Sequence, residues 1–383
     1  MRSVTQALST LGPSEIEAWR DLSRRAVEPN PYFDVDFLLS AHRWLRPDTD
    51  PLVAMVSDAG ELRAVLPFVE RRNVRHLPVV VRSTSAPLGA TVADLHLPLL
   101  APGDLEAAGD VLLRELGRSV HGRPVVVEFG VIRLEGPVWG AIERVASARG
   151  RRLMVRSESA RGAVRPVLRD TGGVAQGAVG VGTDALSHLS TSRRKSVARS
   201  MRAIRSELGP LTWVDRTGDL TAVDDFVRLE AEGWKGDPGE GGEGVVAVRG
   251  GERWFHDVTS RLRSEGRLHV GELQAGGNRV FMSVDMRSGD QWFGMRDVYD
   301  ERYARFGPGT IGRLAEIAWF RTQELRLFDS CVNPTRYPHA ATLYPDRAKV
   351  GRVLVAVNLP AAVGLTVAER ARRELRRRTG EAS

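Results

Sequence analysis

One glycine-containing turn, residues 299–310, has the sequence Tyr-Asp-Glu-Arg-Tyr-Ala-Arg-Phe-Gly-Pro-Gly-Thr. It separates a strand-like stretch from a predicted helix. The glycines at 307 and 309 let the backbone approach an anion, and the free N–H groups of a helix start point towards it. The proline between them fits a first helical turn, where its missing N–H is not needed, and Thr310 is a candidate cap. The turn is typical of a pyrophosphate site, although many ordinary helix starts have the same spacing.

The elements around this turn favour a sheet with helices packed on it. Strand-like runs at 268–273, 279–286 and 291–299 are separated by glycine turns and predict a three-stranded antiparallel meander. After the helix, which is predicted to reach about residue 325, we expect a short strand at 327–329. A loop at Asn333-Pro334 then precedes a further predicted helix, which contains Leu343 and Tyr344.

The first half of the chain alternates helical and strand-like patterns. The predicted helices lie near 13–26, 105–116 and 138–148, and the predicted strands at 51–57, 63–69, 124–129 and 152–156. Alternation of this kind predicts an α/β (α+β) fold rather than a helical bundle. Two domains fit a length of 383 residues.

A glycine-rich segment marks the expected domain junction. Residues 169–182 contain glycines whose spacing matches neither a P-loop nor a dinucleotide fingerprint, so we interpret the segment as a loop. The predicted organisation is an N-terminal domain at 1–168, this loop at 169–182, a catalytic domain at 183–360 and a basic C-terminal helix or tail at 361–383.

Composition narrows the class of protein. A single cysteine, Cys331, excludes an internal disulfide framework and fits a reducing cytoplasm. No apolar run approaches the length of a membrane span, and no signal peptide is recognisable, so we predict a cytoplasmic protein. The eight histidines form no HExxH motif, and a lone cysteine allows no CxxC, so no metal is expected.

The formal charge of +7 is carried almost entirely by arginine. This balance suits a polyanionic partner such as RNA, and also a donor such as CoA that bears several phosphates. Basic helical stretches at 190–205 and 369–378 are either phosphate-binding surfaces or solvated arginine faces, and we favour the second interpretation.

Several motifs occur together in the second half of the chain. A serine- and arginine-rich helix at 190–205 is followed by Leu-Glu-Ala-Glu-Gly-Trp-Lys-Gly at 229–236 and by the turn at 299–309. In this order they resemble the CelD-like branch of the GNAT acetyltransferase superfamily, over residues 189–349. Asn-Pro-Tyr-Phe at 30–33 and the alternation in the first half also resemble this family. The resemblance implies two tandem GNAT-like domains with mixed central sheets flanked by helices, as in the Fem peptidyltransferases.

The resemblance also implies roles for individual residues. In the superfamily the glycine turn holds the pyrophosphate of acetyl-CoA or another acyl-CoA, which is a co-substrate. The residues that match are Arg305, Gly307, Gly309 and Thr310, although Ala304 stands where the family pattern has Gln or Arg. In the family pattern a tyrosine, here Tyr344, protonates the departing thiolate; a core tyrosine is the other interpretation. The Trp-Lys motif and the end of the meander make Trp234, Lys235 and Tyr299 candidate substrate-binding residues.

Acyl transfer needs a base for the incoming amine or hydroxyl, donors for the oxyanion and an acid for the thiolate. Glu230 is the first candidate base, because it falls on an otherwise apolar helical stripe where burial would raise its pKa. The alternative is a buried ion pair, for example with Lys235. Asp329 is a further candidate because it ends a strand beside the expected cleft. Further candidate bases are Glu232, Asp285 and Asp300. Cys331 is interpreted as a buried thiol and His339 as a loop residue.

The sequence therefore predicts an acyltransferase that moves an acetyl or acyl group from acyl-CoA to an amine or hydroxyl by direct attack. The acceptor is a small molecule or saccharide that the sequence does not identify. One alternative is a Fem-like enzyme that takes its group from aminoacyl-tRNA or an acyl-carrier protein. Another is a GNAT-derived binding module without catalysis, because fold does not fix function.

Overall fold

The computed structural model describes residues 1–72, 78–85, 94–118, 122–166 and 186–367. These residues form two compact units. The first comprises Met1–Ser159 and the described residues from Lys349 onward, and the second is Ala160–Ala348. The chain passes between the units within β7 (Leu153–Val164) and again within β13 (Asp346–Ala356). The predicted boundary at 360 differs from this division, and the glycine-rich segment 169–182 lies outside the described residues.

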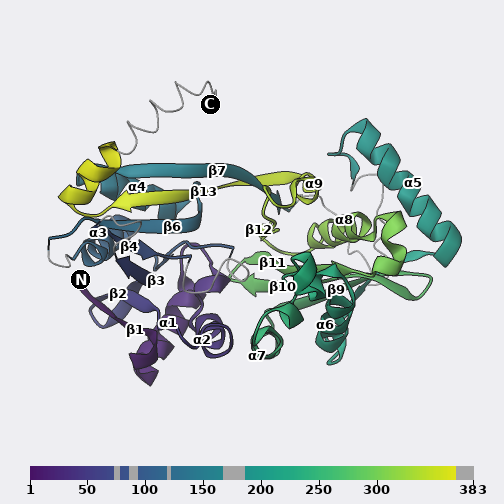
Figure 1. Cartoon of the computed structure of the whole chain (residues 1–383), viewed down its shortest axis with the longest axis horizontal. Helices are drawn as coiled ribbons and strands as arrows, with labels where there is room; N and C mark the ends of the chain where they lie inside the picture. Colours follow the sequence, from purple (N-terminus) through teal and green to yellow (C-terminus); the bar gives the residue numbers. More distant parts are fainter. Residues whose placement is uncertain (73–77, 86–93, 119–121, 167–185, 368–383) are drawn as a thin grey trace. The chain divides into compact units, whose positions relative to one another are not determined.

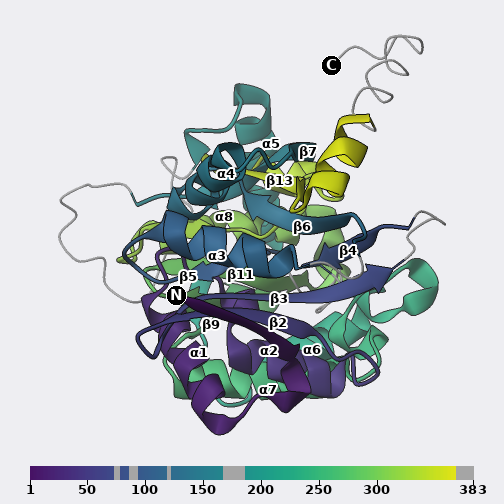
Figure 2. The same cartoon turned by 90° about the vertical axis from the view of Figure 1, so that its left-hand side faces the viewer.

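The first unit has a mixed sheet in the order β1-β2-β3-β4-β6-β13-β7, with β5 paired to β3. The pair β4–β6 is parallel, and β2 and β3 form an antiparallel hairpin. Helices α3 and α1 cover opposite faces of β1–β3 (Figure 2). The strands are β1 (Arg2–Ala7), β2 (Leu52–Asp58), β3 (Glu61–Arg72), β4 (Val80–Ser83), β5 (Leu99–Leu100) and β6 (Val125–Arg133). The helices are η1 (Leu8–Thr10), α1 (Pro13–Arg25), η2 (Pro31–Phe33), α2 (Val35–Trp44), α3 (Leu105–Leu116) and α4 (Pro137–Ala148), with a further helical segment at 359–367.

The second unit has the strand order β7-β12-β11-β10-β9-β8. Helix α8 lies on one face of the meander, and α6 and α7 lie on the other (Figure 1). The strands are β8 (Leu211–Asp215), β9 (Leu268–Ala275), β10 (Asn278–Ser288), β11 (Gln291–Tyr299) and β12 (Leu327–Asp329). The helices are α5 (Thr191–Leu208), α6 (Ala222–Glu232), η5 (Trp234–Gly236), η6 (Pro238–Glu240), η7 (Val245–Ala247), α7 (Gly251–Ser264), η8 (Glu301–Phe306), α8 (Pro308–Phe320) and α9 (Pro338–Ala341).

The α/β (α+β) prediction is confirmed, and so is the antiparallel meander β9-β10-β11. Two helical predictions need correction. Helix α8 ends at Phe320, short of residue 325, and the helix expected to contain Leu343 and Tyr344 ends earlier, at Ala341. Both residues are buried in the same core. Neighbouring residues on a helix point in directions about 100° apart, so the turn before β13 suits their common burial better than a helix does.

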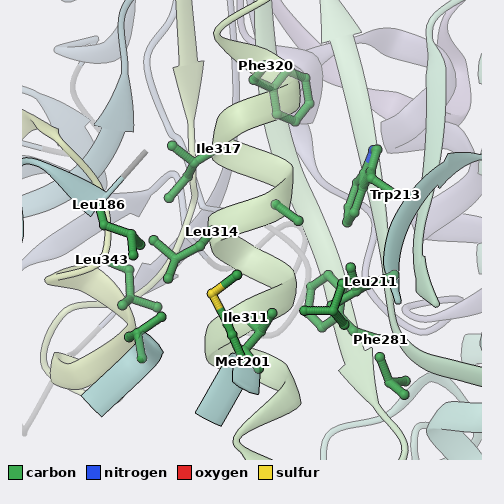
Figure 3. Packing of buried hydrophobic residues seen from close by; sticks show 14 of the residues in the cluster. Leu186, Met201, Leu211, Trp213, Phe281, Ile311, Leu314, Ile317, Phe320 and Leu343 are labelled. Atoms are coloured by element: carbon green, nitrogen blue, oxygen red, sulfur yellow. The ribbon is translucent and has the colours of Figure 1, made fainter. Parts of the chain in front are cut away.

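Helix α8 forms the centre of the second unit's core. Its apolar residues Ile311, Leu314, Ile317 and Phe320 are fully buried. Trp213 and Phe281 of the sheet lie on one side of the helix and Leu343 lies on the other (Figure 3). The core therefore fixes α8, and the turn that precedes it, firmly against the meander.

Replacing Gly312 by alanine is expected to destabilise the protein by about 1–3 kcal/mol, the usual cost of overpacking a core. A Cβ at this position of α8 would lie 2.2 Å from the Cγ of Phe281, a ring that is itself fully buried. The matched control is Gly109→Ala in α3, where no described atom lies within 4 Å of the added Cβ. That variant should be unchanged or slightly more stable. Urea unfolding of both variants measures the difference, and equal stabilities would contradict the close packing of α8.

Candidate active site

Strands β11 and β12 run parallel, but they pair only over Gln291–Phe293 and Leu327–Asp329. A β-bulge follows at once, because Val284 and Asp285 of β10 face Arg296 and Gly294, which leaves one extra residue on β11. A Cβ at Gly294 would lie 2.6 Å from the carbonyl oxygen of Ser330, so the chains are still close at this point. The described part of the chain contains no further pairing between β11 and β12. The two strands therefore separate beside residues 295–299.

The glycine turn leads directly from this separation into α8. Gly307 has φ of +65°, in the left-handed region that favours glycine, and it is the residue before the helix. The predicted cap at Thr310 is wrong, because the helix begins earlier, at Pro308, and Thr310 is its third residue. A Cβ at Gly309 would lie 3.2 Å from the ring of Tyr299. Helix α8 thus presents its N-terminus at the end of β11.

Arg305, the other residue predicted to bind the donor, lies in η8 on the surface. Its guanidinium pairs with Glu207 of α5 and lies 4.7 Å from the ring centroid of Phe306. Within the predicted turn, Glu301–Phe306 form a 3-10 helix. Arg305 remains a cation near the start of α8, although it shares its charge with a carboxylate.

A buried polar cluster lies between the meander and α8. Nδ1 of His269 lies 2.9 Å from Oδ2 of Asp285, and the Ser283 hydroxyl donates to the same oxygen over 3.3 Å. Burial raises the pKa of Asp285 well above its usual range and lowers that of His269 to about 4. Both shifts favour the neutral forms, so at neutral pH this pair is a carboxylic acid or carboxylate beside an uncharged imidazole.

Glu316 of α8 adds a second carboxyl group to this cluster. Burial raises its pKa well above the usual range, and the neighbouring Asp285 and Asp297 raise it further. A hydrogen bond from Ser283 and the charge of Arg313 act in the opposite direction. Two interacting carboxyl groups that share a hydroxyl partner cannot both ionise easily, so the pair retains a proton. Such a pair can accept a proton and return it.

Asp297 of β11 forms the more accessible edge of the cluster. Its carboxylate pairs with Arg313 at 2.5 Å and with Lys235 at 3.3 Å, and each of the three side chains is about one-fifth exposed. Burial raises the pKa of Asp297, but the two cations outweigh it and hold the pKa below the usual range. Asp297 is therefore an ionised group that orients two cations at the surface of the site.

Tyr344 belongs to the same neighbourhood. Its ring is buried among the apolar residues around α8, with its centroid 6.3 Å from that of Phe328. Burial and then the charge of Glu316 raise the pKa of its hydroxyl well above the usual range, while Arg313 opposes them. The hydroxyl therefore stays protonated at neutral pH, the state that a general acid needs.

Two of the predicted bases lie in other ion pairs. Glu230 is fully buried; its Oε1 pairs with Arg296 at 2.9 Å and its Oε2 accepts from the N–H of Val245 at 2.7 Å. A buried ion pair was the alternative interpretation of Glu230, with Lys235 as the example of a partner. Lys235 contacts Asp297 instead. Asp329 pairs with Arg161 at 2.6 Å and accepts from the N–H of Cys331 at 3.0 Å. Both carboxylates hold loops in place, and their catalytic roles stay predictions.

The predicted substrate-binding residues lie around β11. The N–H of Trp234 donates to Glu301 over 2.7 Å, which ties η5 to η8. Nζ of Lys235 also donates to the carbonyl oxygen of Asp297 over 2.5 Å. Tyr299 is the last residue of β11, and its ring lies beside Gly309. The structure thus brings Lys235, Tyr299 and Tyr344 to the end of β11 or to the polar cluster, whereas Glu230 and Asp329 are held in ion pairs with arginines.

Four residues of this site were not predicted from the sequence: Glu316, Arg313, Asp297 and His269. One signal for Glu316 was present: it lies between Ala315 and Ile317 in a strongly apolar helix. A carboxylate at such a position is either paired or functional. His269 and Ser283 gave no signal, because their importance depends on the strand register that sets them beside Asp285.

Residues 191–338 match the family model described as "Acetyltransferase (GNAT) domain". This part of the chain is a GNAT domain. The turn, the separating strands and the polar cluster all lie in the unit that contains the matched residues, and the matched domain indicates an acyltransferase.

Among solved structures, FemX is similar to this chain with a TM-score of 0.55 and 7% identity, covering 96% of this chain and 100% of FemX. L-PGS from Bacillus licheniformis is similar with a TM-score of 0.49 and 13% identity, covering 94% of this chain and 96% of L-PGS. A conserved protein of unknown function from Bacteroides thetaiotaomicron VPI-5482 is similar with a TM-score of 0.49 and 12% identity. The match covers 90% of this chain and 97% of that protein. At its identity the likeness to FemX shows the fold alone. The predicted mixed sheets flanked by helices are confirmed, and the GNAT-like nature of the first unit stays a prediction. A search of curated proteins gave no match.

Two further observations concern only the described residues. They contain no group of three or more His, Cys, Asp or Glu side chains placed to hold a metal ion. No helix among them combines the length and apolar character that crossing a membrane requires.

Proposed function

We propose that the GNAT domain binds acetyl-CoA or another acyl-CoA and transfers the acyl group to an amine or hydroxyl of a small-molecule or saccharide acceptor. The observation that supports this most is the separation of β11 from β12 beside the N-terminus of α8. A separating pair of parallel strands leaves backbone N–H groups beside a thioester arm, and the helix start with its left-handed Gly307 suits a pyrophosphate. A cytoplasmic location accompanies the proposal, as Cys331 is a buried free thiol.

The cluster supports a direct transfer. The nucleophilic nitrogen or oxygen of the acceptor attacks the thioester carbonyl, and its proton passes to the Glu316 carboxylate. Backbone N–H groups of β11 beyond the bulge stabilise the oxyanion. The new C–N or C–O bond then remains as the C–S bond breaks, and the Tyr344 hydroxyl protonates the thiolate. Asp297, with Lys235 and Arg313, orients the acceptor at the more accessible edge of the site.

A thiol-release assay tests this function. The purified protein is mixed with acetyl-CoA or longer acyl-CoAs and with panels of amines, amino acids and saccharides, and free CoA is followed with a thiol reagent. We expect thiol release that depends on both donor and acceptor, together with a product whose mass is increased by the acyl group. Donor binding without release for any acceptor would favour a non-catalytic binding module.

Replacing Gly309 by valine is expected to weaken donor binding at least tenfold. The added side chain meets the ring of Tyr299 at the start of α8, where the donor's pyrophosphate is proposed to lie. A ligand site loses affinity when groups are displaced by even small distances. Calorimetric titration with CoA measures the change. The control is Gly218→Val, where no described atom lies within 4 Å of an added Cβ. Equal affinity of both variants would contradict this donor site.

One observation favours a second candidate, a donor carried on RNA or on an acidic carrier protein. The exposed face of α5 carries a stripe of cations at helical spacing, and none of them pairs with an acidic side chain among the described residues; they are Lys195, Arg199, Arg202 and Arg205. The opposite face packs on the core through Val197, Met201 and Ile204. A cation stripe of this kind attracts polyanions in a strongly salt-dependent manner.

Binding measurements with aminoacyl-tRNA and an acidic carrier protein test this candidate. Affinity that falls steeply with salt, and that an Arg199→Glu/Arg202→Glu variant removes, would favour the tethered donor. CoA binding that this double variant leaves unchanged would favour the acyl-CoA donor.

A further inference from the structure

The first unit contains a pocket of about 520 Å³ on its sheet. It lies over strands β3, β4, β6, β13 and β7, and the helical segment 359–367 contributes Leu365 to its wall. Alternate residues of β6 face it, namely Val126 and Glu128, whereas Val125 and Val127 are fully buried. Its volume is that of a small-molecule site. The proposed acyl transfer does not use this pocket.

A buried carboxylate organises the polar half of the pocket. Glu128 accepts hydrogen bonds from Ser83 at 2.9 Å, from Arg71 at 2.9 Å and from Nε of Arg352 at 3.0 Å. Glu128 itself is only 7% exposed, while the side chains of both arginines are about half exposed. A guanidinium has five N–H donors, so each arginine keeps donors that Glu128 does not use. The carboxylate therefore fixes two cationic groups that remain accessible from the pocket.

The charges and the walls together define the ligand's chemistry. Three arginines, Arg71, Arg156 and Arg352, and one carboxylate give the lining a net charge of +2. The other half is apolar and includes Val81, Val126 and Leu354. Arginine forks recognise carboxylates and phosphates in two-point contacts. A neutral ligand would offer no anionic acceptor to the remaining N–H donors of Arg71 and Arg352, and a purely polar anion would leave the apolar wall uncovered.

We propose that this pocket binds a small organic dianion, with a phosphate or dicarboxylate head on Arg71 and Arg352 and an apolar body against Val81, Val126 and Leu354. Glu128 is then a positioning residue, which holds the two guanidiniums in place for the head group of the ligand. The site is independent of the acyl-CoA proposal, because all of its residues belong to the first unit.

Calorimetric titration tests the proposal with four probes: phenyl phosphate, phenylmalonate, inorganic phosphate and benzyl alcohol. We expect one-to-one binding of at least one aromatic dianion, at least tenfold tighter than that of inorganic phosphate or benzyl alcohol. The preferred dianion identifies the head group. Saturating CoA should leave this binding unchanged, since CoA is proposed to occupy the second unit.

The Arg352→Gln and Arg71→Gln variants should each weaken the binding at least tenfold. The matched control is Arg144→Gln, which removes an exposed arginine of the same unit that pairs with Glu106. Unchanged thermal unfolding without ligand shows that each variant is folded. The proposal is overturned if neither dianion binds better than inorganic phosphate, if the pocket variants bind as well as the control, or if CoA displaces the dianion.

Discussion

The Glu316→Gln variant is expected to lose about 100- to 10,000-fold in kcat for acyl transfer, the range typical of a missing general base. Glutamine keeps the shape of the side chain and its hydrogen bonding to Ser283, but it cannot accept the acceptor's proton. Stability should change little, because the raised pKa of Glu316 already favours its neutral form. The matched control, Glu324→Gln on the surface, should retain full activity. The thiol-release assay at saturating donor measures both variants.

The pH dependence separates a catalytic role from a structural one. The base form of Glu316 appears only as the pH rises through its raised pKa, so the rate should rise with pH along that limb. Tyr344 must stay protonated, and its raised pKa places any loss of rate from its ionisation in the alkaline range. Glu316→Gln should abolish the rising limb of the pH–rate profile. Tyr344→Phe should lower kcat but keep this rising limb. A Glu316→Gln enzyme with wild-type rate and an unchanged profile would exclude this carboxylate as the base.

The second large effect concerns stability. Asp329→Asn is expected to cost about 3–5 kcal/mol, since removing one charge of a buried ion pair strands the other. Arg161 and Asp329 are almost completely buried, with side-chain exposures of 3% and 0%. Asp329 also accepts from the N–H of Cys331, which has a positive φ of 53°. Guanidinium-induced unfolding of the wild type and the variant measures the difference.

The control for this prediction is Asp290→Asn. Asp290 pairs with Arg326 at 3.0 Å, but both side chains are more than half exposed. Exposed pairs contribute about 0–1 kcal/mol. If the two variants lost similar stability, the ion pair at Asp329 would not have the structural role that its burial indicates. If Asp329→Asn kept its stability but lost activity, the catalytic role predicted from the sequence would be favoured instead.

The fold was largely predictable where local patterns are strong. The meander could be read from alternating strands and glycine turns, and α3 and α4 from their apolar periodicity. Strand β13 was not predicted, because Asp346–Ala356 joins charged residues to an apolar run, and its pairing between β6 and β7 makes it a strand. Most of this strand belongs to the first unit, although about 190 residues of the second unit precede it in the sequence. Sequence order gives no indication of such a return.

The site was less predictable, because its residues come from separate elements. Glu230 has the apolar surroundings expected of an activated base, yet Arg296 from β11 neutralises it. A sequence shows that a carboxylate is buried, but not which cation reaches it from another strand. Glu316, Ser283 and Asp285 become a cluster only through the packing of α8 on β10. Local sequence predicted the glycine turn, and the family resemblance pointed to Tyr344; the roles of both stay predictions.

Calorimetric titration of the purified protein with acetyl-CoA, longer acyl-CoAs and free CoA, each at low and raised salt, tests the central claim most directly. The proposed function predicts saturable one-to-one binding that Gly309→Val weakens and that the Arg199→Glu/Arg202→Glu variant retains. Absence of binding to every CoA species, in protein shown to be folded, would contradict the acyl-CoA donor and favour a donor carried on tRNA or a carrier protein.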